Sequence, residues 1–211
     1  MLAGFAVWTA CSCLAPPARA QSEPAAPGTV TTGADSQHGR EEFGIWGGGS
    51  IGTSTLIGRR PDLDFDLGAL RYGRSLWRKG KLGFDWTADV VPVAFLTLDR
   101  SRPGEPSSGR ESVYGAGISP LGFRFDFELL SWLRPYAAAT GGLLYFADRI
   151  PAAGTKFNFT YDFGAGAQIF VLPDRAFTLG YRYQHISNAG LSDSNPGFDS
   201  NVLYMGFSLF R

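Results

Sequence analysis

The chain has 211 residues, and its 19 basic and 19 acidic residues leave no net charge, so composition gives no electrostatic reason to expect a nucleic-acid-binding protein. Its 28 glycines, 14% aromatic residues and 18% charged residues are typical of a β-rich chain with tight turns. After the N-terminal segment no run of about 18 or more apolar residues occurs, which argues against a helical membrane span but is compatible with a β-barrel, whose strands are only alternately apolar.

The N-terminal segment has the features of a secretory signal peptide. It is mostly apolar, and Ala18-Arg19-Ala20 has the small-x-small form of a cleavage site. Both cysteines, Cys11 and Cys13, lie in this segment, so the predicted mature chain has neither a disulfide nor thiol chemistry. We therefore expect a signal peptide at 1–20, a disordered leader at 21–40 and a β-barrel at 41–211.

Eight segments of alternating hydropathy follow. The first, roughly 41–58, contains Gly47-Gly48-Gly49, a run that also suggests a phosphate-binding loop. No helix pattern and no Lys-Ser/Thr pair follows it, so glycines that let a coiled strand bend are the better explanation.

The second segment, about 62–77, opens with the sequence DLDFDLG. Its carboxylates, Asp62, Asp64 and Asp66, suggest a metal site. They alternate strictly with apolar residues, however, so one polar face of a strand is the favoured interpretation.

The next four segments have the same period of two. The third (about 81–98), the fourth (ending near Leu130) and the sixth (about 157–171) carry an aromatic or aliphatic face without a charge, while the fifth (about 132–147) alternates weakly. The connections after the second, fourth and sixth segments are short, and those after the third, fifth and seventh are long and polar. This predicts an all-β fold, an eight-stranded antiparallel up-and-down transmembrane barrel in the outer membrane, rather than a soluble barrel with an apolar lumen.

The last two segments place three reactive side chains together. In the seventh, Tyr181, Tyr183, His185 and Ser187 share one face, and in the eighth Asp199 has the parity to face His185 across the loop. A serine hydroxyl becomes a nucleophile when a base removes its proton, and a carboxylate fixes the tautomer of that base. The residues alone leave two interpretations open, an esterase site and an ordinary polar barrel rim.

The segment HISNAGLSDSNPGFDSN, preceded by YRYQ and followed by the final strand, resembles the signature of the outer-membrane lipid A 3-O-deacylase (PagL) family. The resemblance is specific over roughly 157–211 and only architectural before it. It implies an eight-stranded barrel that hydrolyses the 3-O-linked acyl ester of lipid A with a Ser-His-acid triad on its lipid-facing wall, with no metal and no cofactor.

By this resemblance, Ser187 is the nucleophile, His185 the general base and Asp199 the acid, where the best-known members have Glu. Asn188 and Asn195 match motif asparagines and are candidates to support the oxyanion. Phe163 matches an aromatic residue of the adjacent strand and is expected to contact the acyl chain.

The sequence thus predicts an outer-membrane serine esterase whose partners are lipopolysaccharide and outer-membrane lipid, with no nucleic acid; a homodimer is left open. The alternatives are a barrel phospholipase or acyltransferase that acts on another lipid, a non-catalytic structural barrel, and a soluble lipocalin-like binder.

Overall fold

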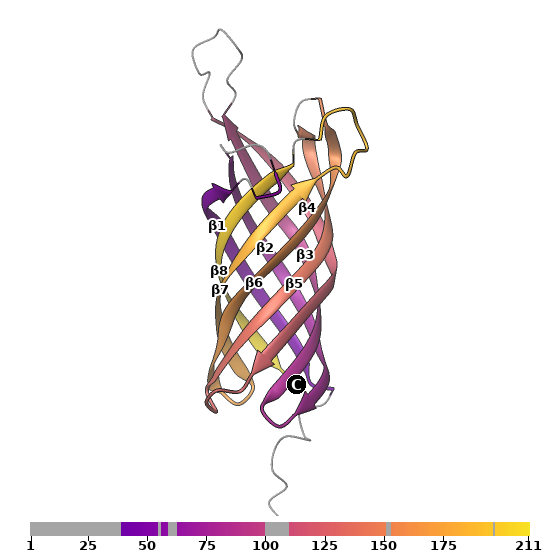
Figure 1. Cartoon of the computed structure of the whole chain (residues 1–211). Helices are drawn as coiled ribbons and strands as arrows, with labels where there is room; N and C mark the ends of the chain where they lie inside the picture. The colour runs from indigo at the N-terminus through magenta and orange to yellow at the C-terminus, as the bar shows by residue number, and fades with distance from the viewer. Residues whose placement is uncertain (1–38, 55, 59–62, 100–109, 151–152, 196) are drawn as a thin grey trace, which may run out of the picture. The chain divides into compact units, whose positions relative to one another are not determined.

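The computed structural model describes residues 39–54, 56–58, 63–99, 110–150, 153–195 and 197–211. The predicted signal peptide, nearly all of the predicted leader and most of the hydrophilic connection near residue 105 lie outside these residues. The described part is a closed barrel of eight antiparallel strands, in which each strand pairs with its sequence neighbours and β1 pairs with β8 (Figure 1). The predicted all-β, eight-stranded fold is confirmed.

The strand bounds follow the predicted alternation closely, with one difference at β1. The strands are β1 Glu41–Ser54, β2 Leu63–Lys79, β3 Leu82–Asp99, β4 Arg110–Phe127, β5 Leu133–Ile150, β6 Thr155–Leu172, β7 Arg175–Ser187 and β8 Phe198–Phe210. The first segment was expected to continue to residue 58, but its strand ends at Ser54. Residues 56–58 instead belong to the connection that leads to β2.

The two ends of the barrel differ. Short connections join β2 to β3, β4 to β5 and β6 to β7, and the C-terminus lies at the same end, which we call the turn end (Figure 1). We call the opposite end, where β7 ends and β8 begins, the loop end. None of the described segments is a helix long and apolar enough to cross a membrane.

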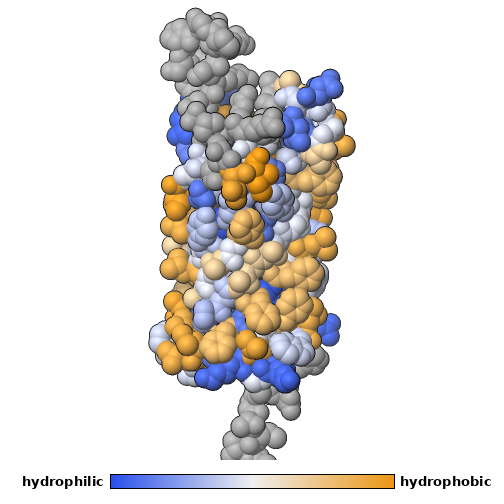
Figure 2. All heavy atoms as spheres, viewed as in Figure 1, coloured by the Kyte–Doolittle hydropathy of each residue, from blue (hydrophilic) through white to orange (hydrophobic). Residues whose placement is uncertain are grey.

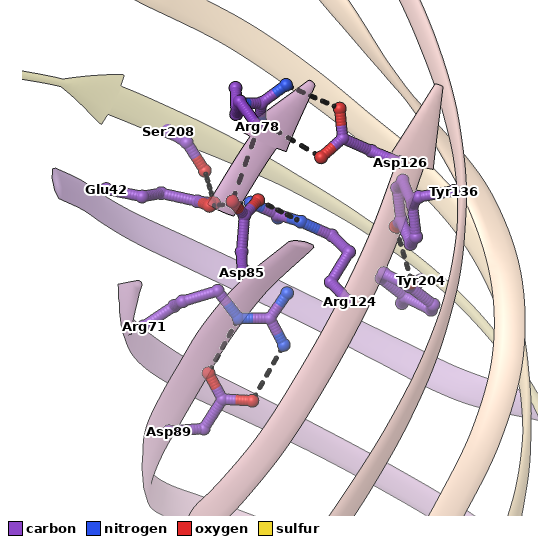
Figure 3. A network of polar contacts seen from close by, with 10 residues as sticks. All are labelled: Glu42, Arg71, Arg78, Asp85, Asp89, Arg124, Asp126, Tyr136, Tyr204 and Ser208. Atoms are coloured by element: carbon purple, nitrogen blue, oxygen red, sulfur yellow. Dashed lines mark hydrogen bonds and ion pairs between the residues drawn. The ribbon is translucent and has the colours of Figure 1, made fainter. Parts of the chain in front are cut away.

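Buried charges fill the interior towards the turn end. Arg124 pairs with Glu42 at 2.5 Å and with Asp85 at 2.8 Å, and Glu42 also accepts a hydrogen bond from Ser208 (Figure 3). Arg78 binds Asp126 through two hydrogen bonds of 2.9 and 3.0 Å. Such pairs can be buried because each charge has a partner of opposite sign.

The interior towards the loop end is mostly apolar, although the buried side chains of Gln184 and Thr160 form a hydrogen bond of 2.6 Å there. Phe65, Leu96 and Phe146 are fully buried there, together with neighbours contributed by the loop-end halves of most strands. Two acidic residues of the DLDFDLG segment lie on the other side of the wall: Asp64 is half-buried and Asp66 exposed, while Leu63, Phe65 and Leu67 point inwards. Asp62, the third, lies outside the described residues. The predicted polar face of this strand therefore exists and is the outer one.

On the outside, large hydrophobic side chains cover the wall, and hydrophilic residues gather at the turn-end rim, at the bottom of Figure 2. Strands β2 to β6 have 17 or 18 residues, whereas about 9–11 residues suffice for a strand to span a bilayer. The surplus lies at the loop end, because among the residues with a described position it is there that the outer wall carries polar residues opposite a mostly apolar interior.

Candidate active site

The predicted site residues lie on the outer wall at the loop end. Along β7 the exposed side chains of Phe177, Leu179 and Tyr181 alternate with buried side chains that point into the barrel, and His185 and Ser187 continue the outward series. Strand register places Asp199 of β8 directly across from His185. Antiparallel pairing of β7 with β8 thus brings together an imidazole and a carboxylate from positions 14 residues apart.

His185 and Asp199 form a buried hydrogen-bonded pair. Nδ1 of His185 lies 2.6 Å from Oδ1 of Asp199, and the side chains are 8% and 0% exposed. Oδ2 of the same carboxylate accepts hydrogen bonds of 2.7 Å from the backbone N–H groups of Ile57 and Gly58. Three donors therefore converge on one carboxylate, which stabilises its charge and fixes its orientation.

The imidazole has one ring nitrogen left for chemistry. Asp199 occupies Nδ1, so Nε2 is the nitrogen available to take a proton from a nucleophile. Gly197, whose φ is 64°, lies against this edge of the ring; a Cβ on it would come within 2.9 Å of Cε1 of His185. The face of the ring packs on Tyr161, with centroids 4.9 Å apart.

Ser187 is the last residue of β7, half-buried beside the pair. Among the residues that the structure describes, its hydroxyl has no hydrogen-bond partner, His185 included. Two residues on one strand face are about 6.6 Å apart at their Cα atoms, so rotation of the serine side chain brings the hydroxyl towards the imidazole.

The two asparagines shape the loop that follows Ser187. The side chain of Asn188 is buried, donates to Ser192 at 3.0 Å and to the carbonyl of Ser194 at 2.9 Å, and accepts from the N–H of Gly190. Its own N–H donates to Oδ1 of Asn195 at 3.1 Å. The side-chain amide of Asn195 is exposed and, within the described residues, makes no hydrogen bond as a donor.

Aromatic residues of β6 line the wall beside the site. Phe159 pairs with Ser187 and Tyr161 with His185, while Phe163 lies two residues further along and contacts the ring of Tyr183 at 5.1 Å. Phe159, Tyr161 and Phe163 are all exposed on the outer wall. Of these three, the sequence pointed only to Phe163, because the β6–β7 register that places Phe159 and Tyr161 nearer to the site cannot be deduced from alternation alone.

The described part of the chain holds no group of three or more His, Cys, Asp or Glu side chains suited to a metal ion. The site instead has a base, a carboxylate and a hydroxyl next to an apolar aromatic wall. This combination can carry out acyl transfer through a serine nucleophile on a substrate that approaches from lipid.

Comparisons with known proteins agree with this architecture. A family model described as lipid A 3-O-deacylase (PagL) matches residues 63–208. A crystal structure of the outer membrane enzyme PagL is 19% identical, with a TM-score of 0.51, and the match covers 78% of this chain and 97% of that chain. A search of curated proteins found no significant match.

Two other outer-membrane barrels are also similar in structure. Neisserial surface protein A (NspA) is 17% identical over 81% of this chain and 95% of its own, with a TM-score of 0.42. OprG from Pseudomonas aeruginosa is 10% identical over 83% and 97%, with a TM-score of 0.47.

Proposed function

The chain belongs to the lipid A 3-O-deacylase (PagL) family, and from this membership we propose that it is a serine esterase that hydrolyses the 3-O-linked acyl chain of lipid A. As a member of this family with an outer-membrane barrel fold, it is located in the outer membrane. The observation that carries the proposal is the buried pair of His185 and Asp199 on the outer wall, next to Ser187.

The position of the site suits a lipid substrate. The side chains around it, Phe159, Tyr161 and Phe163, are apolar or aromatic and exposed on the outer wall. The barrel interior behind them is filled by packed side chains, so a substrate reaches Ser187 laterally from the bilayer. An acyl chain that lies along this wall stays in hydrocarbon while its ester reaches the polar loop end.

In the first step, Ser187 Oγ attacks the carbonyl carbon of the acyl ester while its proton passes to Nε2 of His185. Asp199 stabilises the imidazolium that forms, because its carboxylate accepts the Nδ1 hydrogen. The tetrahedral intermediate collapses when the bond between the acyl carbon and the 3-oxygen of the sugar breaks. The departing 3-oxygen takes the proton from Nε2, and the acyl group remains on Ser187.

In the second step, water attacks the acyl carbon of the acyl-enzyme and gives a proton to Nε2. Collapse of the second tetrahedral intermediate returns that proton to Ser187 Oγ and releases the fatty acid. A hydrogen bond between Ser187 and His185 requires about 2.6–3.2 Å, so the serine hydroxyl turns towards the ring when substrate binds.

Asn195 is the better suited of the two asparagines to stabilise the oxyanion. Both donor contacts of the Asn188 side-chain amide are used within the loop, and its N–H is bound to Asn195. The exposed amide of Asn195 can donate to the developing negative charge while Asn188 holds the loop in shape. Phe163 supports the acyl chain further down the wall.

The first test is the Ser187→Ala variant, expressed in cells next to wild type, with mass spectrometry of extracted lipid A. Wild type should release the 3-O-linked acyl chain, and Ser187→Ala should release none because no nucleophile remains. The control is Ser112→Ala, an exposed serine on β4, which should behave as wild type.

Lipid A that stays fully acylated with folded wild-type protein would contradict the proposal. The same samples should be incubated with phospholipid, because a serine site on a lipid-facing wall also suits a phospholipase. Release of acyl chains from phospholipid but not from lipid A would favour that alternative.

A further inference from the structure

The connection between β1 and β2 contacts the candidate site through its backbone. Ser54, the last residue of β1, pairs with Asp199, so the chain leaves β1 directly beside this carboxylate. The N–H groups of Ile57 and Gly58 then both point at Oδ2 of Asp199, each at 2.7 Å. These donors come from a part of the chain more than 140 residues away in sequence.

The packing around Gly58 leaves no room for a side chain. A Cβ at this position would lie 2.9 Å from Oδ1 of Asp199 and 3.0 Å from the carbonyl of Gly197. Gly197 in turn lies against the ring of His185. The two glycines, the carboxylate and the imidazole therefore form one closely packed unit, in which the backbone at Gly58 and Gly197 packs against the His185–Asp199 pair.

We propose that the β1–β2 connection is part of the active site, and that the N–H groups of Ile57 and Gly58 position Asp199 for catalysis. The inference rests on the proposed function. Ile57 and Gly58 are positioning residues: they act through the carboxylate and touch neither the substrate nor the reacting atoms.

The geometry of a carboxylate explains why this clamp, the two N–H groups of Ile57 and Gly58 on Oδ2 of Asp199, is useful here. A carboxylate that faces an imidazole with one oxygen is free to rotate about χ2 unless its second oxygen is also bound. Two N–H donors on Oδ2 leave Oδ1 pointing at Nδ1 of His185, which keeps the proton on Nδ1 and leaves Nε2 free to accept one. The clamp thus selects the tautomer of His185 that the reaction needs.

The variant Gly58→Ala tests this inference, with Gly141→Ala as the matched control. At Gly141 a Cβ would have no atom nearer than 3.9 Å, so the same substitution is tolerated there. Displacement of the carboxylate should lower kcat of Gly58→Ala roughly tenfold to a hundredfold, the range for a lost hydrogen bond to a charged group, with KM changed less than about threefold. Gly141→Ala should match wild type.

The measurement is lipid A deacylation by the purified full-length barrel in detergent micelles, with folding checked by heat-dependent migration on SDS gels. Wild-type kcat in Gly58→Ala would overturn the inference. If Gly58→Ala does not fold, a backbone ester that replaces the N–H of residue 57 by oxygen removes one donor without adding an atom. The ester variant should also lower kcat, and an unchanged kcat in it would overturn the inference equally.

Combination with Asp199→Ala separates this inference from the proposed function. Because the connection acts through the carboxylate, Gly58→Ala should not lower the residual rate of Asp199→Ala any further. A full additional loss in the double variant would show that the connection acts independently of Asp199. Full activity of Asp199→Ala alone would instead contradict the triad itself. Absence of deacylation by the folded wild-type protein would contradict the proposed function.

Discussion

At the scale of single residues, the candidate site combines a fixed His185–Asp199 pair with a serine, the proposed nucleophile, that makes no hydrogen bond within the described residues. Asp199 is completely buried and accepts three hydrogen bonds, and His185 is held between Asp199, Tyr161 and Gly197. Ser187 is half-buried and, within the described residues, makes no hydrogen bond. The proposed base is therefore preorganised, whereas the proposed nucleophile engages through rotation of its side chain.

The Asp199→Asn variant tests whether this preorganisation depends on charge and tautomer. The N–H groups of Ile57 and Gly58 should hold the oxygen of the new amide, so that its NH2 group faces Nδ1 of His185. Nδ1 must then act as an acceptor, which puts the proton on Nε2 and blocks its role as a base. We expect kcat to fall on the order of 10³–10⁴-fold while the barrel stays folded, measured by lipid A deacylation.

The control is Asp193→Asn, an exposed carboxylate in the same loop, which should retain wild-type activity. A residual rate of Asp199→Asn within threefold of wild type would contradict the assigned role, because it would mean that neither the charge nor the tautomer matters.

At the scale of strands, the sequence predicts most of the architecture for a simple reason. Side chains alternate strictly across a sheet. A run with Phe, Leu and Tyr at every second position therefore identifies both the strand and the side of the sheet on which each side chain lies. The exception is the end of β1. Apolar Leu56 and Ile57 continue the pattern of the first segment, but the strand ends at Ser54. The N–H of Ile57 donates to Asp199 instead of to a neighbouring strand.

The candidate site was only partly predictable. Parity along β7 and β8 brings His185 and Asp199 to one side of the wall, and the structure pairs them. The contribution of the N–H groups of Ile57 and Gly58 cannot be predicted from residue types, because every residue except proline carries such a group. Only the three-dimensional path of the β1–β2 connection reveals them.

Strand β3 offers a test of where the bilayer contacts the wall. Val90 is an exposed outward residue near the middle of the strand, and Thr97 is an outward residue near its loop end, where it bonds Ser112. Arginine in place of Val90 should lower the free energy of unfolding in lipid by about 2–4 kcal/mol, because its charge would lie near the hydrocarbon midplane. Thr97→Arg should cost about 0–1 kcal/mol.

Reversible unfolding in urea with phospholipid vesicles measures both values. Equal losses in the two variants would contradict the membrane boundary inferred from the polar outer wall at the loop end.

At the scale of the whole barrel, the described residues form two stacked regions of opposite polarity. Towards the turn end the interior is ionic and the outside apolar, as expected for a wall in lipid. Towards the loop end the interior is mostly apolar and the outside carries Asp64, Asp66 and Arg110, as expected for a wall in water. The candidate site lies at the loop end of this wall, where the apolar outer surface gives way to polar groups.

This arrangement implies that the apolar interior stabilises the part of the barrel that carries the site. Phe65 is fully buried in it, and Phe95 is 43% exposed on the outer wall at a similar level, so the pair allows a matched test. Phe65→Ala leaves a cavity and should lower the free energy of unfolding by about 3–5 kcal/mol. Phe95→Ala removes the same atoms without a cavity and should cost clearly less.

Deacylation at increasing temperature then links the interior to function. Because the loop-end strands hold β7, β8 and the β1–β2 connection in register, Phe65→Ala should lose activity at a lower temperature than Phe95→Ala, with similar kcat for both well below that point. If Phe65→Ala unfolded and lost activity at the same temperature as Phe95→Ala, the loop-end interior would not support the site, and the polar network near the turn end would have to hold the barrel alone.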